Sequence, residues 1–165
     1  MKIIEPIQLE FSHETALTRK MLGRAPEAHF AWKPHTKSMT LGRLAGHIAE
    51  IPGWVSHILT TEEMVIDMDK YKPFEPATLS DLLKVFDANV ASAAECMKGR
   101  SDAILNATWR LKVGDRVVFE LPRVAVIRLM VLNHMIHHRG QLSVYLRLRD
   151  VPVPATYGPS ADERE

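Results

Sequence analysis

The chain has 165 residues, of which 46% are hydrophobic and 25% charged, so a largely disordered protein is excluded and one domain with a hydrophobic core is expected. Its 21 basic and 20 acidic residues give a formal net charge of +1, which supplies no electrostatic basis for binding nucleic acid or an anionic membrane. We therefore expect a single domain over residues 1–165 with neither kind of partner.

The cysteine content and the N-terminal sequence bear on the compartment. Cys96 is the only cysteine, so no intramolecular disulfide can form, as suits a reducing environment. The first residues lack the long apolar core of a signal peptide. No apolar stretch approaches the roughly 20 residues that span a bilayer. These features predict a cytoplasmic protein.

The first predicted helix covers about residues 5–22. Phe11 and Leu17 supply apolar positions along it, and Gly23 is a plausible stop. Pro26 and Pro34 then indicate a loop with at most one short helical turn.

The second predicted helix begins near Ser38 or Thr40, both good capping residues, and continues to Leu59. Its apolar residues recur at spacings of three and four and define a buried stripe. They are Leu41, Leu44, Ala45, Ile48, Ile51, Val55, Ile58 and Leu59. Pro52 lies within this pattern, so the helix should kink there, or two shorter helices should meet.

The middle of the chain contains a connection and a third helix. Two prolines within Met64–Pro76 indicate a connecting segment. The third helix is expected to open at Ser80, with the negative charge of Asp81 in its first turn, and to end at Gly99.

The pattern then changes to a small β-hairpin. Residues 109–113 alternate between apolar and polar, residues 117–121 are rich in β-formers, and Gly114-Asp115 lies between them. An irregular loop is the alternative. The last helix is expected over about residues 122–148, and a proline-rich tail follows it. Four long helices with short connections predict an all-α antiparallel four-helix bundle, with this hairpin before the last helix.

Three histidines form a candidate metal site. His134 and His138 are one helical turn apart, about 40° from each other around the axis, so both can reach one ion. His47 falls on the apolar stripe of the second helix. Neutral imidazole suits zinc, nickel, copper or iron. The alternatives are a core histidine at position 47 and two partly exposed helix residues at 134 and 138.

Four further residues of the last helix lie near the candidate ligands in the sequence. His137 either borders the site or lies at a surface, and Gln141 either orients a bound water or is an ordinary polar residue. Arg139 is expected to be solvated or to face another subunit. Gly140 costs helix stability, and close approach of a neighbouring helix would explain it.

Four segments of the chain resemble the DinB-like family, and together they span nearly its whole length. They are TRKMLGRAPEAHFAWKPH, SMTLGRLAGHIAEIPGW, LNHMIHHRGQLSVYLR and VPVPATYGPSADE. The resemblance implies a four-helix bundle that is often dimeric. It also implies a metal site whose ligands here are His47, His134 and His138, without departure from the family's pattern.

The expected function follows from an open metal site. Three protein ligands leave a position free for water or substrate, as is typical of catalytic sites, and zinc or nickel is the expected metal. The family resembles thiol-dependent transferases and isomerases, and some relatives are metal-dependent hydrolases. We therefore expect a metal-dependent enzyme of small-molecule thiol transfer or hydrolysis, acting on a small-molecule thiol or electrophile as a homodimer. The alternative is a non-catalytic, metal-stabilised sensor or interaction module.

The sequence identifies no second catalytic group. Glu50 and His57 are expected to point well away from His47, and Cys96 to be inert packing. The tail should dock on the bundle through Val151, Val153 and Tyr157, with Tyr157 bordering the metal pocket; a disordered tail is the alternative.

Overall fold

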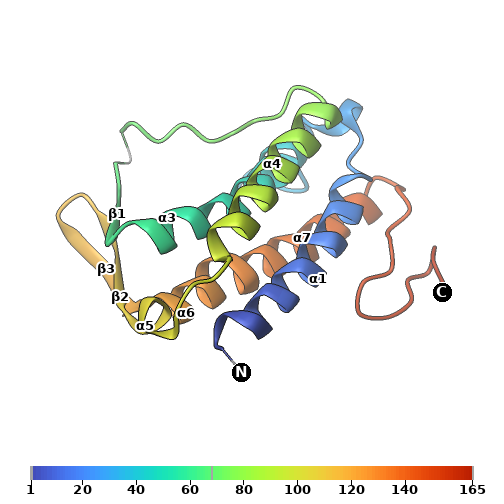
Figure 1. Ribbon diagram of the computed structural model, residues 1–165. Helices are drawn as coiled ribbons and strands as arrows, with labels where there is room; N and C mark the ends of the chain where they lie inside the picture. The colour runs from blue at the N-terminus through green and yellow to red at the C-terminus, as the bar shows by residue number, and fades with distance from the viewer. Residues whose placement is uncertain (1, 68, 165) are drawn as a thin grey trace.

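The structure is a computed structural model that describes residues 2–67 and 69–164. Long helical segments lie side by side in it, and a small sheet lies at one end of them (Figure 1). The helical elements are α1 (Ile4–Leu22), η1 (Glu27–His29), α2 (Leu41–Glu50), η2 (Ile51–Gly53), α3 (Trp54–Thr60), α4 (Leu79–Met97), α5 (Asp102–Asn106), α6 (Arg123–Val126), η3 (Ile127–Asn133) and α7 (His134–Arg147). The strands are β1 (Glu63–Ile66), β2 (Thr108–Val113) and β3 (Arg116–Pro122).

The expected all-α four-helix bundle is correct only in part. The described residues are mainly helical, but they include a three-stranded sheet, and two of the expected long helices are subdivided. The second consists of α2, the 3₁₀ turn η2 around Pro52, and α3, which matches the alternative of two shorter helices. The last consists of α6, the π-helical segment η3 and α7.

Side-chain caps fix where two helices begin. The Thr40 hydroxyl accepts a hydrogen bond from the Arg43 amide at 3.1 Å and opens α2. The Thr78 hydroxyl accepts from the Asp81 amide at 3.0 Å, so α4 begins at Leu79, one residue before the predicted opening. Such caps satisfy amide groups that have no partner within the helix.

The sheet has the order β1-β2-β3 and includes the predicted hairpin. Strands β2 and β3 pair antiparallel, and Gly114 supplies the positive φ of +55° that their turn requires. Strand β1 pairs parallel to β2, with Glu63 opposite Arg110. It starts one residue before the predicted connection and extends into it, so Met64–Ile66 form a strand that the sequence did not predict and that depends on hydrogen bonds to β2.

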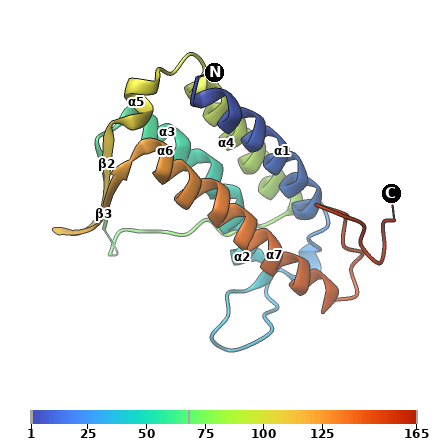
Figure 2. The same ribbon diagram turned by 90° about the horizontal axis from the view of Figure 1, so that it is seen from below.

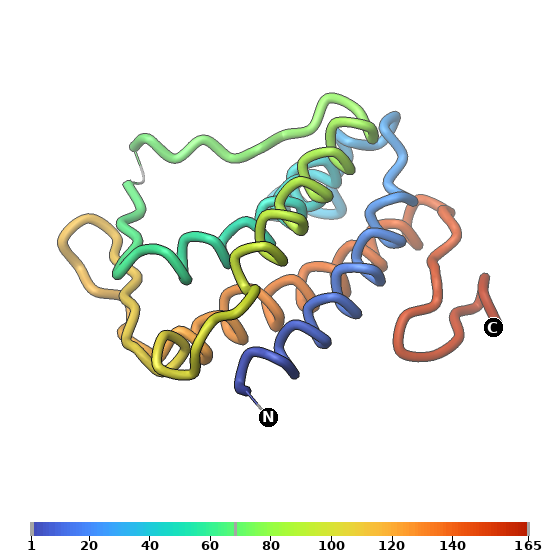
Figure 3. The backbone as a smooth tube through the Cα atoms, viewed as in Figure 1, coloured from blue at the N-terminus to red at the C-terminus, as the bar shows by residue number. Residues whose placement is uncertain are grey.

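Residues 69–78 connect the sheet to α4 as an extended chain (Figure 3). This connection packs closely on α2 at Gly46, where a Cβ atom would collide with the Phe74 carbonyl oxygen. A side chain at position 46 would therefore push the connection away from the helix.

The hydrophobic core lies between the helices and extends under the sheet. Its largest fully buried side chains come from the helices and from β2: Phe11, Met21, Leu22, Leu41, Leu44, Ile48, Ile51, Ile58, Leu82, Phe86, Met97 and Trp109. Of the helices in the described residues, none is both long enough and apolar enough to cross a membrane.

The C-terminal tail packs beside α1 and the end of α7 (Figure 2). The Tyr157 hydroxyl donates to Glu14 Oε2 at 2.7 Å and accepts from Arg139 at 2.6 Å. Burial and the hydrogen bond to Glu14 raise the pKa of Tyr157. The predicted docking of the tail is thus confirmed. The predicted place of Tyr157 is wrong, because it lines a cavity of about 300 Å³ that none of the three candidate ligands borders.

Arg139 is buried, contrary to the prediction of a solvated or subunit-facing charge. Its side chain is 3% exposed and pairs with Glu14 at 2.8 Å, while its guanidinium also donates to the Thr18 hydroxyl at 3.1 Å. Gly140 does not mark a close helix contact within this chain, since a Cβ there would meet no atom within 4 Å. The guanidinium group of Arg139 faces α1 because the buried carboxylate of Glu14 lies there.

Replacing Arg139 by methionine should lower the free energy of unfolding by about 3–5 kcal/mol, because the Glu14 carboxylate would remain buried without its partner. Urea unfolding followed by circular dichroism measures this change. The matched control is Arg128→Met, which removes the exposed Arg128–Glu10 pair between η3 and α1. That variant should lose no more than about 1 kcal/mol. Equal losses in the two variants would contradict the prediction.

Candidate metal centre

The three candidate ligands come from two helices that lie against each other. His47 is on α2, and His134 and His138 are on the first turns of α7, which faces α2 (Figure 2). His134 follows directly after the π-helical η3. A π-helical turn is wider than an α-turn and is frequent at functional sites.

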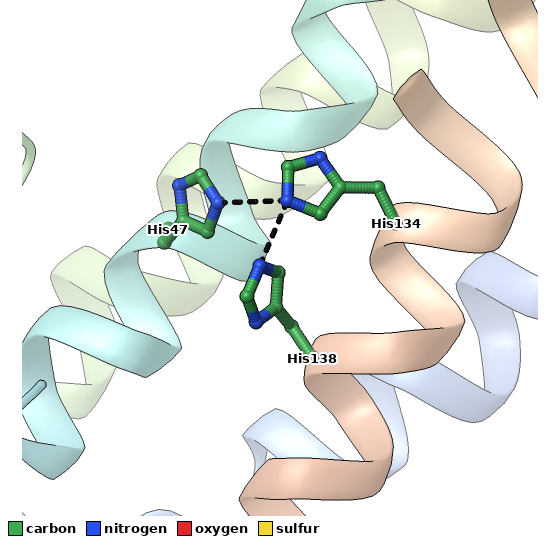
Figure 4. A group of neighbouring side chains, drawn as sticks. All are labelled: His47, His134 and His138. Carbon is green, nitrogen blue, oxygen red and sulfur yellow. Dashed lines mark hydrogen bonds between the residues drawn. The ribbon is translucent and has the colours of Figure 1, made fainter. Parts of the chain in front are cut away.

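The three imidazole rings converge on one point, as Figure 4 shows. His134 Nε2 lies 3.3 Å from His47 Nε2 and 2.8 Å from His138 Nε2. One nitrogen from each ring lies within 4.8 Å of the other two, so the cluster can hold one metal ion. In tetrahedral coordination with Zn–N bonds of about 2.0–2.1 Å, the nitrogens stand roughly 3.3 Å apart. The His47–His134 separation already matches this value, and the His134–His138 pair would have to open by about 0.5 Å.

The environment favours the neutral form of the imidazoles that a metal requires. Burial, reinforced by His138 and His47, lowers the pKa of His134 to about 4. Burial also lowers the pKa of His138, although its hydrogen bond with Gln141 acts in the opposite direction. At neutral pH both rings therefore offer a lone pair, and no proton has to leave before a cation binds.

Two oxygen atoms lie behind the rings, on the side away from the shared centre. Gln141 Oε1 is 2.7 Å from His138 Nδ1, and Glu50 Oε2 is 3.8 Å from His47 Nδ1. The Nδ1 atom of His47 is buried and has no hydrogen-bond partner among the described residues, and a small shift of Glu50 would satisfy it. An Nδ1–H that points at such an oxygen leaves the Nε2 lone pair for the metal. This donor arrangement fits a three-histidine metal site.

Glu50 thus belongs to the site, contrary to the prediction that it points away from His47. Residues three apart on a helix are surface neighbours, and this spacing could have identified Glu50 from the sequence. Two contacts hold its carboxylate in place. Arg43 pairs with Oε2 at 3.4 Å, and the Phe74 amide donates to Oε1 at 3.1 Å. Gln141 contacts the candidate ligand His138 directly, and the prediction that it orients a bound water stays a prediction.

Two cavities of about 510 and 570 Å³ adjoin the histidines. Both are bordered by Trp54, Ile66 and Met130; the first also by His134 and His137, the second by His47 and His57. His137 is exposed, and it borders the first cavity beside His134. The Trp54 ring lies 5.8 Å from the His47 ring and 5.4 Å from the His134 ring, measured between centroids. Trp54 was not among the predicted site residues, although it lies two helical turns after His47 on the same face.

Comparison with known proteins agrees with the fold and with the sequence resemblance. The chain is similar to a DinB-like protein from Bacillus cereus ATCC 10987, with 24% identity, a TM-score of 0.69, and coverage of 88% of this chain and 92% of that one. It is also similar to a DinB-like protein (YjoA) from Bacillus subtilis, with 17% identity, a TM-score of 0.70, and coverage of 98% and 100%. No curated protein matches the chain. The family model of the DinB family matches residues 7–165, and the chain belongs to the DinB family.

Proposed function

We propose that His47, His134 and His138 hold one divalent transition metal, zinc or nickel, in a single domain that acts as a metal-dependent enzyme of small-molecule thiol transfer or hydrolysis. The supporting observation is the convergence of three imidazole nitrogens from α2 and α7 beside two cavities. Within the cluster the described residues supply three ligands, which is the number typical of catalytic zinc sites.

The residues around the three histidines have different roles in such a metal site. Gln141 orients the ring of His138 through a hydrogen bond, and Glu50 would orient the ring of His47 after the small shift that brings it to Nδ1. Trp54 and Met130 form apolar walls beside the ligands and limit the access of water. A bound metal would activate a thiolate, polarise a carbonyl group or lower the pKa of a water molecule.

The alternative is a non-catalytic, metal-stabilised sensor or interaction module. One observation favours it: the three ligands join two separate helices, so a bound ion would cross-link α2 to α7. Chelation followed by thermal unfolding separates the two roles. A structural ion should raise the unfolding temperature strongly, whereas removal of a catalytic ion leaves the fold nearly as stable and abolishes turnover alone.

Wild-type protein purified without chelating resin should contain about one metal per chain, and His134→Ala should contain far less, because two histidines alone bind weakly. Elemental analysis by mass spectrometry measures the occupancy. His137→Ala is the matched control on the same helix, since His137 lies outside the ligand cluster. Unchanged occupancy in His134→Ala would remove the proposal.

Glu50→Gln should weaken metal binding by roughly 10–100-fold, because the neutral amide polarises His47 less than the carboxylate does. Competition with a chromophoric chelator measures the dissociation constant. Glu120→Gln, which changes an exposed carboxylate on β3, should leave it unaltered. If both variants bind metal as tightly as the wild type, Glu50 does not support the site.

We also propose a homodimer formed through helix faces. Val144 on α7 and Leu148 directly after its end are 57% and 54% exposed, and a partner would bury them. Light scattering at micromolar concentration should give about twice the chain mass of 18.7 kDa. Val144→Glu should shift the mass towards the monomer, because it places a charge in the interface. A wild-type mass near 18.7 kDa would contradict the proposal.

A further inference from the structure

The two cavities beside the histidines share one wall. Trp54, Ile66 and Met130 border both, so the cavities are two ends of one depression between α3, η3 and the sheet. The sheet lies against this end of the helices in Figure 1. We call the depression the Trp54 trough and define it by Trp54, Ile66, Leu111, Phe119 and Met130.

The two ends of the trough differ in chemistry. At the end bordered by His134, the sheet contributes Leu111 and Phe119 and η3 contributes Leu129. These side chains are apolar, and the Asp67–Lys70 ion pair lies at the opposite end, where Tyr71 also borders the cavity. A ligand that fits this distribution is apolar where it meets the sheet.

The trough is continuous with the proposed metal site. His134 borders its apolar end and His47 its polar end, and the Trp54 ring contacts both imidazoles. A small molecule with a donor atom on the metal would therefore extend directly over Trp54. The two cavities, of about 510 and 570 Å³, are large enough for such a molecule, because pockets for small molecules occupy about 300–1,000 Å³.

We propose that the Trp54 trough binds the non-reacting part of the substrate, and that this part is an alkyl or aryl group of about four to eight carbons. The inference rests on the proposed metal site and names the substrate class for it. The reactive donor group lies at the three histidines, and the apolar group lies between Met130 and the side chains of Leu111 and Phe119. The sheet is then the element that selects the substrate.

Exposure of apolar side chains supports this assignment. Leu129 is 48% exposed beside the trough, although the neighbouring Ile127 and Val131 are fully buried. An apolar ligand would remove such surface from water, whereas a polar ligand would leave the carbon-lined end unmatched. A protein segment is a less suitable occupant, because cavities of about 510 and 570 Å³ lie in the size range of small-molecule pockets.

The test uses the cobalt-loaded full-length protein and hydroxamic acids, whose metal-binding group stays constant while the tail changes. Acetohydroxamic acid has no tail, hexanohydroxamic acid has an alkyl tail, and an ether-containing analogue of equal length has a polar one. Changes in the visible absorption of bound cobalt give the dissociation constants without any activity assay. Full burial of four methylenes would be worth roughly two orders of magnitude, so even partial burial in an open trough should give the alkyl compound at least about tenfold tighter binding than either other compound.

Two variants test where the alkyl chain of the hydroxamic acid binds. Phe119→Ala and Leu129→Gln should each reduce the preference for the alkyl compound by about threefold or more while leaving acetohydroxamic acid binding unchanged. Leu129→Gln changes a half-exposed side chain, so it preserves the fold if Phe119→Ala does not. Val118→Ala is the matched control, because Val118 is 46% exposed on the same strand and does not line the trough.

The outcomes separate this inference from the function on which it rests. Failure of the protein to bind cobalt overturns both. If cobalt binds but the compounds have equal affinities, or none of them binds, the metal site stands and the apolar-substrate inference is overturned. A preference that survives in both trough variants places the tail elsewhere and likewise overturns it.

Discussion

The contact between α2 and α7 carries the candidate site, because it places His47 opposite His134 and His138. The i, i+4 pair on α7 exists in any helical conformation of that segment. The third nitrogen, from His47, joins this pair only when α2 packs against α7 with the right position and rotation. The apolar stripe of α2, including Leu44 and Ile48, is fully or almost fully buried and determines that rotation. Core packing therefore determines the geometry in which polar ligands meet.

Rotation of α7 is restrained on two sides. On one side Gln141 contacts the ring of His138 at 2.7 Å. On the other side the adjacent Arg139 pairs with Glu14 of α1, both buried, and the hydroxyl of the largely exposed Tyr157 hydrogen-bonds to both side chains. A buried pair contributes little net stability, but it strongly disfavours arrangements in which either charge loses its partner. The Glu14–Arg139–Tyr157 cluster therefore restricts α7 to the orientation that presents His134 and His138 to α2.

The sheet and the connection after it complete the surroundings of the site. Residues 69–78 pass close to Gly46, and the Phe74 amide holds the carboxylate of Glu50. Strands β1 and β2 bring Ile66 and Leu111 to the cavities beside the histidines. The proposed ligand-binding surface on the small sheet and the candidate metal site on the helices thus meet at Trp54, at the start of α3.

The sequence by itself determined the helical segments, the hairpin, the docked tail and the family, and it identified the three histidines. These features depend on local periodicity, on capping and turn residues, and on spacing along one chain segment. Tertiary structure alone decided that Met64–Ile66 form a strand, because a four-residue segment gains its hydrogen bonds only from β2. It also decided that Arg139 is buried, since the compensating Glu14 lies 125 residues away in the sequence. Tyr157 likewise hydrogen-bonds to Arg139 and Glu14 and does not border the candidate metal site. Non-local partners of this kind leave no periodic signal, because burial of a charge depends on a carboxylate that only the folded chain brings near.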